Sequence, residues 1–156
     1  MRDLTVDTEI LIIASGISDH GSQVDCIKLL NQMMEIVDVY LVLDKIGTIE
    51  QEYKNKMNEV TFGMIFVRYM WDKLKINSVD RAKGPEWKPI NTKLDEVHFH
   101  PNDRKFIQAA MKSNSKRIVA QEDDYSDEVR DILRQKRLKI TVDSAKSACN
   151  FICANQ

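Results

Sequence analysis

The stretch TVDTEILIIASG, residues 5–16, predicts the end of a strand followed directly by a helix, the unit from which we infer the fold class. Leu4 to Val6 is a short run of β-forming residues that ends at Asp7, and the apolar residues from Ile10 to Ala14 then recur as on the buried side of a helix that stops at the closing glycine. Asp7 and Glu9 adjoin this apolar run, although burying an unpaired charge is costly. These acids therefore either cap the helix or are held at a sheet edge for a cation.

The rest of the chain alternates between short apolar runs and helical patterns. Strands are predicted at residues 4–6, 39–44, 93–99, 116–121 and 138–142, and helices at 10–16, 24–37, 46–57, 62–76, 102–112, 127–136 and 144–153. Residues 78–92, which contain Gly84, Pro85 and Pro89, are predicted to be irregular. This alternation is typical of an α/β fold with right-handed crossovers. We expect one three-layer α/β/α domain, residues 1–156, with a mostly parallel central sheet of about five strands.

Composition limits the class of protein. With 156 residues, 43% of them hydrophobic and 30% charged, the chain is long enough for one core. The formal charge of -1 gives no overall attraction to nucleic acid or membrane, so a polyanion would have to meet a local patch. Cys26, Cys149 and Cys153 lack zinc-site spacing, and neither a signal-peptide pattern nor a membrane-spanning run occurs. A cytoplasmic protein with no membrane partner is expected.

Acidic residues follow two of the predicted strands. Asp7 comes after the first strand, and Glu122 to Asp124 come after the strand at 116–121. These strands are neighbours if the strand order reverses near the first one, and ligands of such sheets gather at the carboxyl ends of the strands. Glu50 and Glu52 on a helix and Asp103 at the start of another could join the same crevice. Clustered carboxylates repel unless a divalent cation neutralises them, and oxygen ligands suit Mg²⁺ or Mn²⁺.

Four motifs resemble, in order, the signatures of PIN-domain nucleases over nearly the whole chain: VDTEIL (6–11), IEQEY (49–53), HPNDRKFIQAA (100–110) and IVAQEDDY (118–125). The resemblance implies a five-stranded parallel sheet with helices on both faces and a metal-dependent ribonuclease site. The catalytic residues that it implies are Asp7, Glu52, Asp103, Glu122 and Asp124. Of these, Asp7, Asp103, Glu122 and Asp124 would hold Mg²⁺ or Mn²⁺, and Glu52 would orient a water.

The resemblance also implies a substrate and partners. Thr8 matches a hydroxyl residue that supports the site, and Thr8, Lys45, Arg104 and Lys105 are candidates for contacts to substrate phosphates. Single-stranded RNA is the expected substrate, with a toxin, defence or processing role left open. A neutralising protein partner and a homodimer are both compatible with the resemblance.

Two positions depart from the family pattern. Glu9 stands where the family commonly has asparagine, and Glu122 where it commonly has aspartate. A longer side chain moves a ligand by about one C–C bond, and a misplacement of about 1 Å can cost roughly a hundredfold in rate. A PIN-like binding or scaffold module whose ion site has decayed is therefore an alternative.

The site residues also have structural interpretations. Asp7 could be a helix N-cap, and Asp103 opens a helix whose dipole favours an acid. Helical periodicity turns Glu50 toward the buried stripe, whereas the resemblance selects Glu52, which we favour. The acidic run after the fourth strand could be a solvated turn. His98 and His100 have no third metal ligand in view, so we interpret them as structural or substrate-adjacent.

A phosphotransfer domain is the remaining rival. A phosphatase of the haloacid dehalogenase type requires an Asp-x-Asp pair after the first strand, where this chain has Glu9 as the second acid. A response-regulator receiver requires an aspartate at the end of a central strand, for which Asp44 is available.

Overall fold

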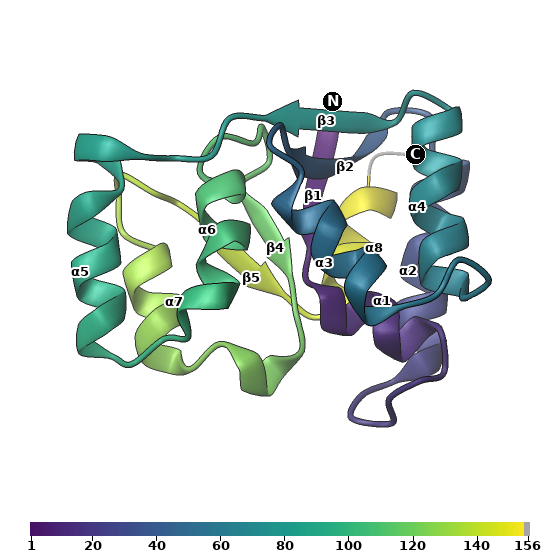
Figure 1. The fold of residues 1–156 in the computed structure, drawn as a ribbon, viewed down its shortest axis with the longest axis horizontal. Coiled ribbons are helices and arrows are strands. Elements are labelled where there is room, and N and C mark those ends of the chain that lie inside the picture. The colour runs from purple at the N-terminus through teal and green to yellow at the C-terminus, as the bar shows by residue number, and fades with distance from the viewer. Residues whose placement is uncertain (155–156) are drawn as a thin grey trace.

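The computed structural model describes residues 1–154 and contains one sheet of five parallel strands between two layers of helices (Figure 1). The strands are β1 (Arg2–Val6), β2 (Val39–Asp44), β3 (Ile76–Val79), β4 (Arg117–Val119) and β5 (Thr141–Asp143), in the order β3-β2-β1-β4-β5. The predicted three-layer α/β/α fold is confirmed. Residues 155 and 156 of the predicted domain lie outside the described part of the chain.

The strand order reverses at β1, which is the condition under which the first and fourth strands become neighbours. β1 pairs with β2 on one side and with β4 on the other, with Val6 opposite Val119 in the second pair. The first strand therefore ends beside the fourth, so the residues that follow them, Asp7 and the acidic run 122–124, begin at the same edge of the sheet. This reversal point is where open parallel sheets collect ligands.

The first seven helices connect successive strands, and the eighth follows the last strand. They are α1 (Thr8–Ala14), α2 (Gln23–Glu35), α3 (Thr48–Lys56), α4 (Phe62–Asp72), α5 (Lys88–Glu96), α6 (Arg104–Ala110), α7 (Asp127–Leu133) and α8 (Ala145–Cys153), with short 3-10 turns η1 (Gly84–Glu86), η2 (Pro101–Asp103) and η3 (Glu122–Asp124). Helix α2 packs against α1, α4 and α8, whereas α6 packs over β1, β2 and β4 and α5 packs against α7. None of the helices in residues 1–154 has both the length and the apolar character needed to cross a membrane.

Helix α1, which begins directly after Asp7, is held in place by its neighbours. It ends at Ala14, and the chain turns away at Gly16, whose φ of 75° lies in the left-handed region that glycine adopts without strain. A Cβ at Gly63, in the first turn of α4, would lie 3.0 Å from the Leu11 carbonyl oxygen and 2.8 Å from the Met57 sulfur. Only glycine allows this close approach of α4 to α1. The apolar side of α1, including Leu11 and Ile13, is fully buried.

The third strand was predicted at the wrong place. Helix α4 ends at Asp72 rather than continuing to residue 76, because Leu74 adopts a φ of 57° and turns the chain into β3. The segment predicted as irregular thus begins with a strand. Strand β3 pairs only with β2, at the edge of the sheet, which explains why Asn77 and Ser78 occur where a central strand would be apolar.

Residues 93–99 were predicted as a strand, but residues 93–96 form the end of a helix and 97–99 form the turn after it. Helix α5 begins with a proline in its first turn and buries Ile90 and Leu94, which lie four residues apart. It ends before His98, whose φ is 58°. The strand predicted at 39–44 occurs with those ends, and the other predicted helices and strands occur with shifted ends. The fifth strand, for example, spans 141–143 rather than 138–142.

Candidate functional site

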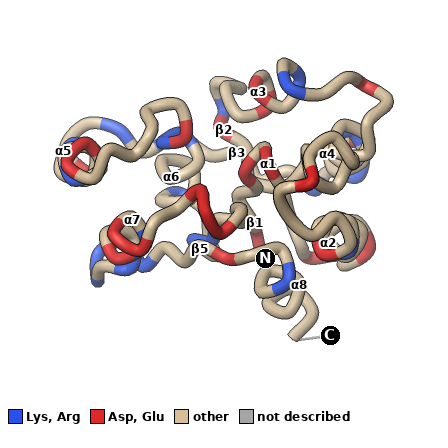
Figure 2. The backbone as a smooth tube through the Cα atoms, turned by 90° about the horizontal axis from the view of Figure 1, so that it is seen from below, with Lys and Arg blue, Asp and Glu red and all other residues tan. Residues whose placement is uncertain are grey.

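A pocket of about 420 Å³ opens where β1 and β4 end. It is lined by Asp7, Thr8, Glu9 and Ile12 at the start of α1, by Glu52 and Lys56 of α3, by His100, Asn102 and Asp103 at η2, and by Asp124 of η3. Four chain segments far apart in sequence thus contribute carboxylates to one concavity. Figure 2 shows acidic segments gathered around the end of β1.

Asp7 is the most deeply placed acid of the pocket, with 7% of its surface exposed. Its carboxylate accepts a hydrogen bond of 3.2 Å from the Glu9 backbone N–H, so it does cap α1, and within residues 1–154 it has no ion-pair partner. Burial raises the pKa of Asp7 from 3.8 to about 7, with smaller contributions from the charges of Asp103, Asp124 and Glu52. The cap and ligand interpretations of Asp7 are compatible, because one carboxylate oxygen caps α1 while the residue also lines the pocket.

The pocket's other aspartates are also destabilised as anions. Partial burial, followed by the charge of Glu52, raises the pKa of Asp103. Partial burial, followed by the charges of Glu9, Asp103 and Asp123, raises the pKa of Asp124. Each carboxylate is therefore held near others without enough positive charge to compensate, which is the environment that a bound cation stabilises.

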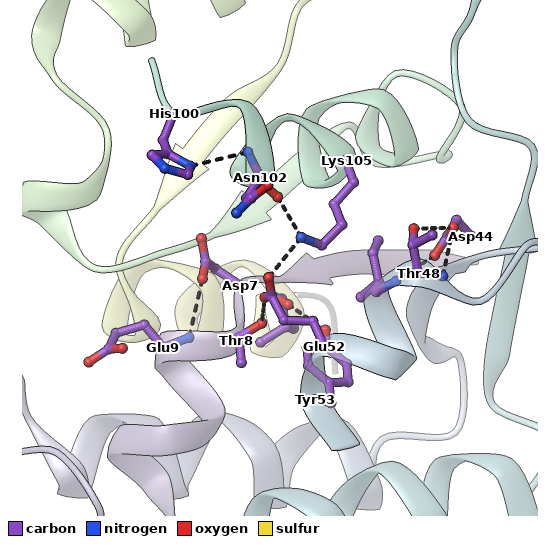
Figure 3. A network of polar contacts seen from close by, with 12 residues as sticks. Asp7, Thr8, Glu9, Asp44, Thr48, Glu52, Tyr53, His100, Asn102 and Lys105 are labelled. Carbon is purple, nitrogen blue, oxygen red and sulfur yellow. Dashed lines mark hydrogen bonds and ion pairs between the residues drawn. The ribbon is translucent and has the colours of Figure 1, made fainter. Parts of the chain in front are cut away.

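Glu52 differs because its carboxylate is already paired. Thr8 donates its hydroxyl hydrogen to one oxygen, and the Lys105 ammonium lies 2.7 Å from the other (Figure 3). Lys105 also donates to the Asn102 carbonyl at 2.5 Å. These contacts fix Glu52 between α1, α3 and η2.

The ambiguity between the two glutamates of α3 is resolved by their contacts. Glu50 accepts a hydrogen bond of 2.5 Å from the Trp71 indole of α4 and pairs with Lys54 at 3.2 Å. It lies in a separate groove between α3 and α4. Glu52, favoured from the sequence, is the one that lines the acidic pocket.

The predicted site residues Glu122, Lys45 and Arg104 do not line the acidic pocket. Glu122 lines a neighbouring pocket with Arg130 and Asp143, whereas Asp124, the other acid predicted from this run, lines the acidic pocket. Lys45 pairs with Asp80 at 3.1 Å.

Arg104 is buried at the start of α6. Its guanidinium contacts the Asn91 side chain at 2.8 Å, the Asp95 carboxylate at 2.6 Å and the Phe99 carbonyl at 2.5 Å. These bonds fasten α5 and its following turn to α6. The interpretation of Arg104 as a phosphate contact therefore has no geometric support, because its donors serve the fold.

The donor set of the pocket fits a hard divalent cation held partly through water. All its acidic ligands offer oxygen, which Mg²⁺ and Mn²⁺ prefer. No group of three or more His, Cys, Asp or Glu side chains within residues 1–154 is arranged to hold a metal ion directly. Mg²⁺ usually keeps several of its waters and uses only one or two carboxylates, so an outer-sphere arrangement around Asp7 suits these residues.

Asp44 does not have the exposed position that a receiver domain needs. It ends β2 but is buried, and it accepts hydrogen bonds from the Thr48 N–H at 3.1 Å, the Thr48 hydroxyl at 2.6 Å and the Ile49 N–H at 2.9 Å. Although burial opposes ionisation, these bonds hold the pKa of Asp44 below its usual value. Its carboxylate caps α3 rather than facing solvent.

Several pocket residues were not assigned to the site from the sequence. Glu9 was named beside Asp7 as a cap or cation residue and as a departure from the family pattern, but it was not assigned to the site, and His100 was left as structural or substrate-adjacent. His100 precedes a proline, an arrangement typical of the position just before a helical turn, and it does cap η2. That signal, not used in the sequence analysis, would have placed His100 at the start of the segment carrying Asp103 but would not have shown that both line one pocket.

Comparisons of this chain with models of known families, with curated proteins and with solved structures returned no match. The functional conclusion therefore depends on the geometry of the pocket and on the motif resemblance.

Proposed function

We propose that this chain is a divalent-metal-dependent nuclease that hydrolyses phosphodiester bonds, with single-stranded RNA as the preferred substrate. The single observation that carries the proposal is the convergence of Asp7, Glu52, Asp103 and Asp124 on one pocket at the reversal point of a parallel sheet. The ribonuclease preference follows from the resemblance to PIN-domain nucleases.

The residues have distinct roles in this proposal. Asp7, Asp103 and Asp124 would hold Mg²⁺ or Mn²⁺ in the pocket. The bound cation would neutralise the carboxylates and the scissile phosphate and promote ionisation of the attacking water. Glu52, fixed by Thr8 and Lys105, would accept a hydrogen bond from that water and orient it toward phosphorus. Attack of the water on phosphorus would break one ester P–O bond and release two strand ends.

Hydrolysis in the presence and absence of metal tests the proposal. Purified protein is incubated with labelled single-stranded RNA, duplex RNA and single-stranded DNA in Mn²⁺, in Mg²⁺ and in chelator. We expect cleavage of single-stranded RNA with either metal, none in chelator, and none by an Asp7→Asn variant that is folded by circular dichroism. Metal-dependent cleavage that persists in folded Asp7→Asn would refute the assigned site.

A metal-free binding module is the second candidate, and one contact favours it. Lys105 lies 2.7 Å from Glu52, so an ammonium already supplies part of the charge that a cation would bring. Binding of single-stranded RNA that is equally tight in Mn²⁺ and in chelator, without cleavage in either, would select this alternative.

A further inference from the structure

His100 places an imidazole ring at the rim of the acidic pocket. It belongs to the turn between α5 and η2 and lines the pocket together with Asp7 and Asp103. Figure 3 shows the ring beside Asn102, across the pocket from Glu9 and near the Asp7 carboxylate. The ring is exposed, so a ligand entering the pocket can reach it.

The tautomer of His100 follows from one hydrogen bond. Its Nδ1 accepts the backbone N–H of Asn102 at 3.2 Å. A ring nitrogen that accepts a hydrogen bond carries no proton, so the neutral ring bears its proton on Nε2. Within residues 1–154 this Nε2 makes no hydrogen bond. His100 therefore presents one N–H donor without a protein acceptor.

A neutral donor has an advantage beside these carboxylates. A lysine there would pair with a carboxylate, as Lys105 does with Glu52, and would compete with a cation for it. A neutral imidazole leaves the acids free for the cation and can still donate to an anionic oxygen. The substrate class proposed above carries such oxygens on every phosphate.

We infer that His100 is a substrate-contacting residue whose Nε2–H donates a hydrogen bond to a non-bridging phosphate oxygen of the nucleic acid in the acidic pocket. This inference rests on the proposed function for the identity of the ligand. The contact positions the strand at the rim and does not require His100 to gain or lose a proton.

Two substitutions of His100 distinguish the contribution of Nδ1 from that of Nε2. In His100→Asn the amide oxygen takes the place of Nδ1 and keeps the cap on the Asn102 N–H, because asparagine is a preferred capping residue, but nothing replaces Nε2. In His100→Gln the amide nitrogen reaches the place of Nε2 and can donate there. His98→Asn is the matched control, since His98 lies two residues earlier and does not line the pocket, and asparagine tolerates its left-handed backbone.

Two readouts decide the inference. The first is KM and kcat for Mn²⁺-dependent cleavage of a labelled single-stranded RNA. The second is the Kd of the same RNA in Mg²⁺, measured by fluorescence anisotropy in the Asp7→Asn background. We expect His100→Asn to raise both KM and Kd by roughly fivefold to twentyfold, the loss of one hydrogen bond to an anion, with His100→Gln recovering much of it and His98→Asn without effect.

Equal KM and Kd for His100→Asn and the parent, or equal losses in His100→Asn and His100→Gln, would overturn the inference. Failure of the proposed function looks different, because the wild-type chain would then show no metal-dependent cleavage. In that case the Kd comparison alone decides whether His100 contacts RNA, and the absence of RNA binding by the parent would overturn the contact as well.

Discussion

Lys105 of α6 and Glu52 of α3 form an ion pair of 2.7 Å across the rim of the acidic pocket. Both side chains are largely shielded, with 12% and 21% of their surfaces exposed, and Thr8 holds the second oxygen of Glu52. The pair therefore fixes a carboxylate that would otherwise be free to rotate. It also separates the roles of the acids, because Glu52 is paired within the protein whereas Asp7 is not.

Replacing Lys105 should expose the role of this pair. In Lys105→Met the long apolar stem is kept and the ammonium is lost, so Glu52 keeps only the Thr8 hydroxyl. We expect cleavage to fall by roughly tenfold to a hundredfold, since Glu52 is no longer held in one geometry, with kcat affected more than KM. An unchanged kcat would show that the orientation of the Glu52 carboxylate does not depend on Lys105. Lys45→Met, which removes an exposed ion pair with Asp80, is the control and should cleave normally.

The two acids of η3 should differ in importance. Asp124 lines the acidic pocket and Glu122 lines the neighbouring one. Asp124→Asn is expected to reduce metal-dependent cleavage at least a hundredfold, whereas Glu122→Gln, of equal charge change in the same turn, should stay within about threefold of wild type. Steady-state kinetics on one RNA measure both. Comparable losses in both variants would restore the assignment of both acids that was made from the sequence motif.

Asp7 should make stability depend on pH. In the folded chain its carboxyl holds a proton up to about pH 7, and in the unfolded chain only up to about pH 4, given its ordinary pKa of 3.8. Because the folded state binds more protons in this window, stability falls as the pH rises from 4 to 7, by a total of the order of 4 kcal/mol.

Asp7→Asn, which cannot ionise and still caps α1, should remove this cost. We expect its denaturant midpoint to exceed that of wild type at pH 8 and to match it near pH 4. Urea unfolding at several pH values gives the comparison, with Asp127→Asn, at an exposed position of α7, as a surface control. Parallel profiles for wild type and Asp7→Asn would show that Asp7 ionises as freely as an exposed acid.

Divalent cations should stabilise the folded chain through the same carboxylates. An ion present at 100 times its Kd adds about 2.7 kcal/mol, or roughly 5–10 °C in Tm for a chain of this size. The shift should be larger at pH 8 than at pH 5.5, because the pKa values of Asp7, Asp103 and Asp124 are all raised and their protons compete with the ion. Differential scanning fluorimetry with Mn²⁺ measures it. An equal shift in Asp7→Asn would place the ion elsewhere.

Lys75 offers a test of the fold itself. Its buried ammonium donates to the carbonyls of Met33, Met34 and Ile36, where α2 ends. In Lys75→Met these carbonyls lose their donor, and we expect the free energy of unfolding to fall by about 2–3 kcal/mol. Chemical denaturation measures the loss. A change below about 0.5 kcal/mol would mean that water replaces the ammonium at no cost.

Local sequence patterns were enough to predict the fold class and the edge of the sheet at which the candidate site lies. Strand β2 is a dense apolar run, β1 ends in the β-forming residues Leu4 to Val6, and most helices carry one periodic apolar stripe, so the local pattern sufficed to identify them. The position of Asp7 directly after β1 then placed an acid at the carboxyl edge of the sheet. These features are local in the chain, which is why they can be recognised without coordinates.

Tertiary structure alone decided β3, α5 and the choice among the acids. The left-handed backbone at Leu74 that ends α4 has no glycine to signal it, and β3 is an edge strand with polar residues. Glu122 and Asp124 are two residues apart in one acidic run, and the turn of η3 decides which of them enters the pocket. Side-chain direction in such a turn is set by packing against segments distant in sequence, and this information is absent from the local pattern.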